Sequence, residues 1–206
     1  MRRLFAVLSV VVLLAHAADQ FEPVRVSIRH ALDVTTVPSI AVAVAKDGNI
    51  LWEEGFGWAD REKRIPATAH TLYSLSSITK TFTATGLMLL VRVGKVDLDK
   101  PVNDYLGDAK LTGRAGDTSK ATVRSIANHS SGLPPHYQYF YEGEPFRPPN
   151  MDEVILHYGI LVRPPGERYE YSNLGYGILG EVISRAMGQP YRDFIRQEVF
   201  AKLGLH

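Results

Sequence analysis

The chain has 206 residues, of which 45% are hydrophobic and 22% are charged, and its formal net charge is +1. This length and composition predict one globular domain with a sizeable core. The near-neutral charge argues against a nucleic-acid partner, because such proteins carry a basic surface. The sequence holds no cysteine, which excludes disulfides, thiolate metal sites and a cysteine nucleophile.

Residues 1–17 have the pattern of an export signal. Two arginines form a basic start, an apolar run follows from Leu4 to Ala15, and small residues end the segment. This pattern predicts a signal peptide that is cleaved before Ala18. The alternative is an uncleaved membrane anchor, but the apolar run is shorter than the ~20 residues that a spanning helix needs. We therefore expect a mature domain, residues 18–206, in the periplasm or outside the cell, with no stable membrane span after cleavage.

The first predicted elements of the mature chain are a helix and a pair of strands. Residues 22–33 carry apolar side chains at roughly helical spacing, which predicts a helix. The Asp47-Gly48 pair lies between two β-prone segments, and it predicts the turn of a β-hairpin.

A second helix is predicted in "YSLSSITKTFTATGLMLL", Tyr73 to Leu90. Ser76 or Ser77 can cap this helix, and Gly94 is expected to end it. Lys80 lies within the predicted helix, and a lysine on a buried helix needs a partner or a role. The residues that predict burial of this helix are Phe82, Leu87, Met88, Leu89 and Leu90.

The remainder of the chain reads as mostly helical. A short helix is predicted within residues 122–134, and two further helices run from about Asn173 to Met187 and from Tyr191 to Lys202. Residues 135–150 lack periodicity and predict a long ordered loop. Its aromatic residues either line a substrate cleft or pack the loop itself: Tyr137, Tyr139, Phe140 and Tyr141. A helix and a strand pair followed by helices predict an α/β or α+β fold with a helical lobe.

Ser77 and Lys80 are candidates for a nucleophile and its base. Ser77 is the one serine of the chain with a lysine three residues later. In a helix this spacing brings the two Cβ atoms to about 5–6 Å of each other. A serine hydroxyl is a poor nucleophile until a base takes its proton, and a lysine can serve when desolvation disfavours its charged form. The pattern also arises by chance on surface helices, so alone it leaves both interpretations open.

Tyr171 and Asn173 form a second candidate pair, just before a predicted helix. In extended backbone, residues two apart point the same way, so both side chains can face one cleft. A phenol near a lysine loses its proton more easily, and a carboxamide can hydrogen-bond both a lysine and a substrate amide. The alternative is that Asn173 caps the next helix and Tyr171 packs.

Taken together, "SITK", "YSN", the intervening "NHSSGLP" and the upstream "FGWAD" resemble the serine β-lactamase-like family. More narrowly they resemble its class C branch, which includes class C β-lactamases, D-Ala-D-Ala carboxypeptidases and related esterases. The resemblance runs from about Pro38 to the end of the chain. It implies that Ser77 is the acylated nucleophile and Lys80 its proton acceptor. It further implies that Tyr171 relays protons to the leaving group and activates water, and that Asn173 positions the substrate.

The expected function is that of a secreted serine hydrolase that forms an acyl-enzyme with a small-molecule or peptide substrate. A β-lactam, a D-amino-acid peptide and a small ester all remain open as substrates, because fold-level similarity does not choose among them. The alternative is an inactive fragment or family member that binds peptidoglycan-like ligands or a protein partner. The oligomeric state is left open.

Neither a metal nor a cofactor is expected. The histidines show no H-E-x-x-H or other tight ligand spacing. His129, within "NHSSGLP", is predicted to hold a helix end and a turn rather than to perform chemistry.

The resemblance covers the N-terminal portion of the family's β-lactamase/transpeptidase-like fold. The family's third motif is a Lys-Thr-Gly or His-x-Gly element on a strand. Downstream of Tyr171 the one similar sequence is Lys202-Leu203-Gly204, which is expected to end a helix instead. We therefore expect an incomplete fold, in which the N-terminal helix, the hairpin and the helical lobe are present. The C-terminal strands and closing helix would be missing, and residues 18–206 alone would turn over substrate poorly.

Overall fold

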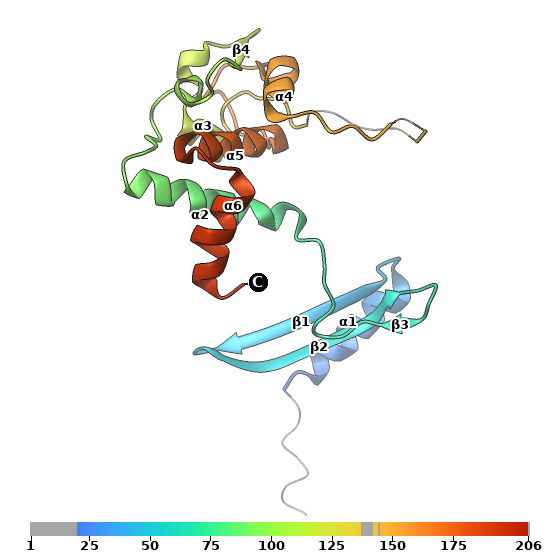
Figure 1. The fold of residues 1–206 in the computed structure, drawn as a ribbon. Helices are drawn as coiled ribbons and strands as arrows, with labels where there is room; N and C mark the ends of the chain where they lie inside the picture. Colours follow the sequence, from blue (N-terminus) through green and yellow to red (C-terminus); the bar gives the residue numbers. More distant parts are fainter. Residues whose placement is uncertain (1–19, 137–141, 144, 206) are drawn as a thin grey trace, which may run out of the picture. The chain divides into compact units, whose positions relative to one another are not determined.

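A computed structural model describes residues 20–136, 142–143 and 145–205 (Figure 1). The predicted signal peptide lies outside these residues, as do the four aromatic residues singled out in the predicted loop. The chain divides after Ser74 into two compact units, which are described separately below.

The first unit contains one helix and a three-stranded antiparallel sheet in the order β1-β2-β3. Its elements are α1 (Glu22–Val34), β1 (Ser39–Lys46), β2 (Asn49–Asp60) and β3 (Ile65–Pro66). Asp47 and Gly48 both have positive φ, 53° and 78°, which is the conformation of a type I′ hairpin turn. The predicted helix and hairpin are therefore confirmed, while the short β3 was not predicted.

Helix α1 contacts the sheet through one side. Trp52 of β2 is buried, Phe21 stacks on its ring at 4.9 Å, and the Arg25 guanidinium lies 5.0 Å from its centroid. Arg25 also forms a salt bridge of 2.5 Å with Glu54. The apolar pattern of α1 is only partly used, because Val24 remains 44% exposed.

The second unit, from Leu75 onward, is mainly helical (Figure 1). Its longer helices are α2 (Thr79–Arg92), α4 (Met151–Tyr158) and α5 (Asn173–Met187), and its shorter ones are α3 (Val123–Ala127) and α6 (Tyr191–Ile195). A π-helical turn, η4 (Arg196–Phe200), and a 3₁₀ turn, η5 (Ala201–Leu203), continue α6. Further 3₁₀ turns are η1 (Ser76–Ile78), η2 (Val102–Tyr105) and η3 (Thr118–Lys120). A short parallel pair, β4 (Thr112–Gly113) with β5 (Ile160–Leu161), completes it.

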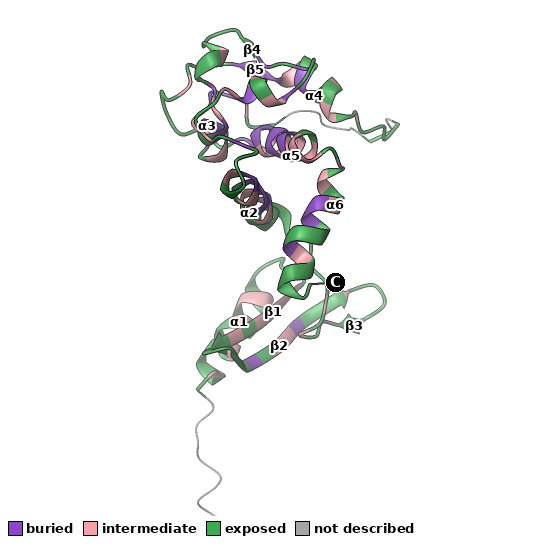
Figure 2. Cartoon of the chain, turned by 60° about the vertical axis from the view of Figure 1, so that its left-hand side comes forward, coloured by how far each residue is buried: buried purple, intermediate pink, exposed green. Residues whose placement is uncertain are grey.

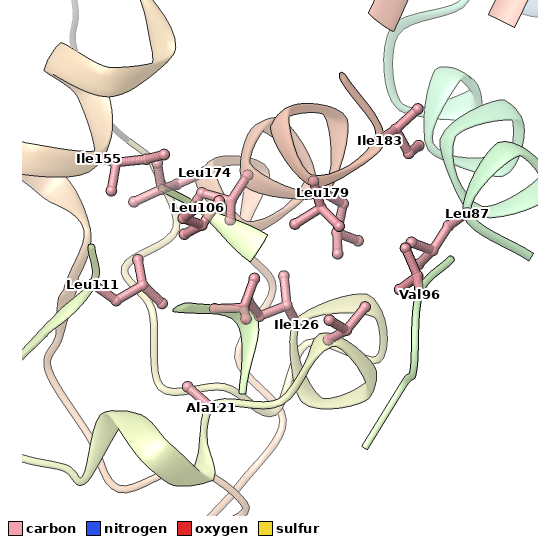
Figure 3. Packing of buried hydrophobic residues seen from close by; sticks show 14 of the residues in the cluster. Leu87, Val96, Leu106, Leu111, Ala121, Ile126, Ile155, Leu174, Leu179 and Ile183 are labelled. Atoms are coloured by element: carbon pink, nitrogen blue, oxygen red, sulfur yellow. The ribbon is translucent and has the colours of Figure 1, made fainter. Parts of the chain in front are cut away.

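Helix α5 forms the centre of the core of this unit. Its predicted bounds are confirmed, and its apolar residues recur with helical spacing and are fully buried: Leu174, Ile178, Leu179, Val182 and Ile183. Figure 3 shows buried side chains of α2 and α3 that point toward α5. Figure 2 shows buried residues on α5 and on the helices around it. Gly188 ends the helix in the left-handed conformation.

Helix α2 differs from its prediction at its start and on one face. It begins with the 3₁₀ turn η1, and neither turn nor helix has a side-chain cap, so the predicted capping by Ser76 or Ser77 is wrong. Gly94, with φ of 72°, follows its end as predicted. Leu87 is buried but Met88 is 49% exposed, because α5 and α6 pack against part of the helix surface only.

Helix α4 and the β4–β5 pair were not predicted. The start of α4 carries a capping box, in which Asn150 accepts a hydrogen bond from the Glu153 N–H and the Glu153 side chain accepts one from Asn150. Asn-x-x-Glu before an apolar run is a signal that could have revealed the helix. The two-residue strands offer no periodicity from which to predict them.

The turn that follows α3 holds the segment before α5 in place. Main-chain hydrogen bonds run from Glu170 N–H to the His129 carbonyl and from Asn173 N–H to the Pro135 carbonyl, both at 2.7 Å. The same turn also packs closely against Arg163 at Gly132, which has φ of 78° and where a Cβ would collide with the Arg163 carbonyl. The second candidate motif is thus anchored at both ends.

Candidate active site

The structure brings the four predicted site residues into one cluster within the second unit. The Ser77 hydroxyl oxygen accepts a hydrogen bond of 2.9 Å from the Tyr171 phenol and one of 3.3 Å from the Lys80 ammonium. Lys80 also donates to the Asn173 Oδ1 at 2.6 Å. A serine thus lies within proton-transfer distance of two groups that can act as bases.

Ser77 and Lys80 meet because of the turn that begins α2. Ser77 lies in η1 and Lys80 in the first turn of α2, so their three-residue spacing places them on one side, as predicted. Ser76, directly before the nucleophile candidate, has φ of 46°, which a residue with a Cβ rarely adopts. Strained backbone of this kind is often found next to reacting groups.

Tyr171 and Asn173 face the same way because Ser172 between them is extended, with φ −130° and ψ 114°. Ser172 also caps α5, since its hydroxyl accepts a hydrogen bond from the Gly175 N–H at 2.9 Å. The interpretation in which Asn173 caps the helix is therefore wrong, and its amide is available to contact Lys80 instead.

The charge of Lys80 sets the electrostatics of the site. Its ammonium lies 4.8 Å from the ring centroid of Tyr171 and 5.6 Å from that of Tyr176, within the range of cation–π attraction. The polar interaction with Lys80, and after it the hydrogen bond to Ser77, holds the pKa of the Tyr171 phenol below its usual value of 10.0. Tyr171 therefore loses its proton more readily than a free phenol does.

Three further residues contact the cluster that the sequence argument did not assign to it. Tyr176 lies one turn after Asn173 on α5, a spacing that could have revealed it. His136 contacts the Asn173 amide, with 3.2 Å between His136 Nδ1 and Asn173 Nδ2. His129 packs against the Tyr171 ring with centroids 4.5 Å apart. Both histidines belong to an irregular turn, whose course the sequence pattern does not fix.

A pocket of about 410 Å³ opens beside Lys80 and Asn173, between α2, α5 and α6, with Thr83, Glu181 and Tyr191 among its lining residues. A larger pocket, of about 770 Å³, is lined by α1 and β2 of the first unit and contains none of the four candidates.

Within the described ranges, no three His, Asp or Glu side chains are grouped so that they could hold a metal ion. No helix of the described chain is long and apolar enough to cross a membrane.

The Lys202-Leu203-Gly204 sequence does not form a strand motif. Lys202 and Leu203 lie in η5, and Gly204 ends that turn with φ of 68°. The prediction that this sequence ends a helix is confirmed.

Comparison with known proteins places the chain in a family. The Beta-lactamase family model matches residues 25–206, so the chain belongs to the β-lactamase family. It is similar to penicillin-binding protein 4* of Bacillus subtilis (strain 168), with 31% identity over 80% of this chain and 36% of that protein. The expected β-lactamase-like relationship is thereby confirmed.

Solved structures support the same assignment of fold. The chain resembles the octameric penicillin-binding protein homologue from Pyrococcus abyssi, with a TM-score of 0.77 and 31% identity over 90% of this chain and 43% of that one. It also resembles D-amino acid amidase from Ochrobactrum anthropi SV3, with a TM-score of 0.71 and 31% identity over 86% of this chain and 47% of that one. The predicted partial β-lactamase-type α/β fold is confirmed, and the chain spans about a third of the length of the curated relatives it matches.

Proposed function

We propose that the protein carrying this chain is a serine hydrolase of the class C type, which cleaves an amide or an ester through an acyl-enzyme on Ser77. The observation that carries the proposal is the Ser77 hydroxyl held between Lys80 and Tyr171 at 3.3 and 2.9 Å. The family membership and the similarity to penicillin-binding proteins and to an amidase support it.

In the first step, the Ser77 oxygen attacks the carbonyl carbon of the substrate and a C–O bond forms. The serine proton passes to Lys80 in its neutral amine form, while the Tyr171 phenol gives its own proton to the departing nitrogen or oxygen as the C–N or C–O bond breaks. This leaves a Tyr171 phenolate beside the Lys80 ammonium. The N–H of Ser77 lies in the first turn of η1, where it has no acceptor within the helix, and it stabilises the developing oxyanion. Asn173 orients the substrate amide while it holds Lys80.

In the second step, the Tyr171 phenolate takes a proton from water, and the resulting hydroxide attacks the acyl carbonyl. The bond to Ser77 breaks, the acid product leaves, and the Lys80 ammonium returns a proton to the serine oxygen. The lowered pKa of Tyr171 supports this role, since a base is most effective when its pKa approaches the working pH.

The test applies a panel of chromogenic substrates to the whole protein that carries this chain, because residues 18–206 alone are expected to turn over substrate poorly. The panel is a cephalosporin, the p-nitroanilides of D- and L-alanine, and a p-nitrophenyl ester. We expect at least one class to release a burst of chromophore equal to the enzyme concentration, followed by slower turnover. Tyr171→Phe should lower turnover about 10²- to 10⁴-fold, which is typical of a lost proton-transfer group. The matched control is Tyr169→Phe, because Tyr169 is 66% exposed and lies two residues away. Folded protein that releases no chromophore from any class would contradict the proposal and favour an inactive binding protein.

We also propose that the protein is exported and cleaved before Ala18. The basic and apolar pattern of residues 1–17 supports this. Protein produced in a bacterium with an intact export pathway should have an N-terminus near Ala18. A cytosolic product that still begins at Met1 would contradict export.

A further inference from the structure

His129 is buried beside the candidate base and is not used in the chemistry described above. It is 9% exposed, and its ring lies against three phenol rings, with centroid distances of 4.5 Å to Tyr171, 5.2 Å to Tyr176 and 5.6 Å to Tyr169. These rings come from α5 and from the segment that precedes it. A polar ring at such a place needs a defined hydrogen-bonding role.

That role is given by the backbone of Ser172, whose N–H donates to His129 Nδ1 at 3.1 Å in a buried hydrogen bond. An imidazole nitrogen accepts a hydrogen bond only when it carries no proton, so this contact requires the neutral ring with its proton on Nε2. The His129 carbonyl accepts a second bond, from the Glu170 N–H at 2.7 Å. His129 therefore holds the residues on both sides of Tyr171.

The backbone of His129 makes this double contact possible. Its φ is 64°, in the left-handed region that asparagine and histidine enter more readily than most residues. The ring and the carbonyl can then both address the segment from Glu170 to Ser172. This conformation is costly, and it persists only where surrounding contacts fix it.

We propose that His129 is a positioning residue for Tyr171, whose neutral imidazole fixes the main chain at Ser172 and supports the phenol ring at bonding distance from Ser77. The inference deepens the proposed function and rests on it, because Tyr171 acts as a base there. A displacement of about 1 Å in a reacting group can cost 10²-fold in rate, so the support is expected to be visible in turnover.

Protonation of His129 would break this arrangement. Nδ1 would become a donor facing the Ser172 N–H, and a second positive charge would stand near Lys80. Burial first, and the charge of Lys80 second, hold the pKa of His129 below its ordinary value of 6.5. The other titratable groups that face the ring are the phenols of Tyr169, Tyr171 and Tyr176. The neutral ring is therefore the state expected at neutral pH.

The sign of the effect on stability follows from this lowered pKa. The unfolded chain takes up a proton at His129 near pH 6.5, whereas the folded chain takes it up only at lower pH. The contribution of His129 to stability is therefore fully present above pH 6.5 and is lost as the pH falls through the folded-state pKa.

Two variants and one control separate positioning from simple packing. His129→Asn keeps a side-chain acceptor for the Ser172 N–H and tolerates the left-handed backbone, whereas His129→Ala keeps neither. We expect His129→Ala to lower kcat about 10²-fold with KM changed less than about threefold. His129→Asn should recover a large part of that loss. The control is His157→Asn, because His157 is exposed on α4 and bonds only within its own helix among the described contacts. It should leave kcat unchanged.

A second measurement does not depend on activity. Nuclear magnetic resonance of isotope-labelled histidine should show His129 neutral, with its proton on Nε2, at pH 6.5 and somewhat below. A protonated ring at pH 6.5, or a proton on Nδ1 of the neutral ring, would overturn the inference. So would folded His129→Ala protein with wild-type kcat. If wild-type protein shows no turnover at all, the proposed function fails, while the tautomer still decides whether His129 is held as inferred.

Discussion

Replacing Ser77 with alanine is expected to abolish hydrolysis, with a loss of at least about 10⁴-fold in kcat. Removing the nucleophile of a serine hydrolase leaves only substrate binding and the oxyanion donors, and such losses reach about 10⁶-fold in related chemistry. The measurement is the steady-state rate with whichever chromogenic substrate the wild-type protein turns over. The hydroxyl is small and exposed, so we expect the variant to fold normally.

Ser76→Ala is the matched control, because it removes the same hydroxyl from the neighbouring position. Ser76 makes neither of the hydrogen bonds that the Ser77 hydroxyl accepts from Lys80 and Tyr171. Its variant should therefore keep activity within about tenfold of wild type, the residual effect arising from the strained backbone at this position. Loss of activity in Ser76→Ala with retention in Ser77→Ala would show that the assigned nucleophile is wrong.

Replacing Lys80 gives the second large effect. Lys80→Ala removes the proposed proton acceptor and the partner of Asn173 Oδ1, and we expect acylation to slow about 10³-fold, as for other general bases. Lys80→Arg should not restore the rate. A guanidinium stays protonated at any working pH, so it cannot take the serine proton. The measurement is the rate of the chromophore burst in stopped-flow experiments.

Lys202→Arg serves as the control for this substitution. Lys202 lies in η5, the last helical turn described, and the Lys202→Arg substitution should leave the chromophore burst unaffected. Substantial acylation by Lys80→Arg would exclude Lys80 as the base and would leave Tyr171 as the remaining candidate. The hydrogen bond between Lys80 and Asn173 would then serve only to place the positive charge of Lys80 in the site.

The sequence predicted those parts of the molecule in which local chemistry decides the structure. Asp47-Gly48 requires a hairpin because few other residues accept two positive φ angles, and α5 follows from apolar residues at helical spacing. The pairing of Ser77 with Lys80 follows from helical geometry, and that of Tyr171 with Asn173 from extended backbone. Resemblance to the β-lactamase-like family linked the two pairs, since no local rule brings residues so distant in sequence together.

The structure differs from the sequence-based predictions where long-range contacts determine the local conformation. Ser77 was expected to start or cap a regular helix, but the chain reaches it through a strained Ser76 and a 3₁₀ turn. The cap of α5 is Ser172 and not Asn173, because the turn after α3 holds Ser172 by its N–H and its hydroxyl. The contacts of His129 with Ser172 and Glu170 depend on this same turn. Its tertiary contacts leave no periodic signal in the sequence.

The most direct test of the central claim is covalent labelling of Ser77. Purified protein is treated with a fluorescent β-lactam or a fluorophosphonate, and the adduct is located by mass spectrometry of its peptides. The account predicts a single adduct per chain on Ser77, absent from Ser77→Ala and retained in Ser76→Ala. An adduct on Ser76 or on another residue, or no adduct in folded protein that binds the probe, would contradict it.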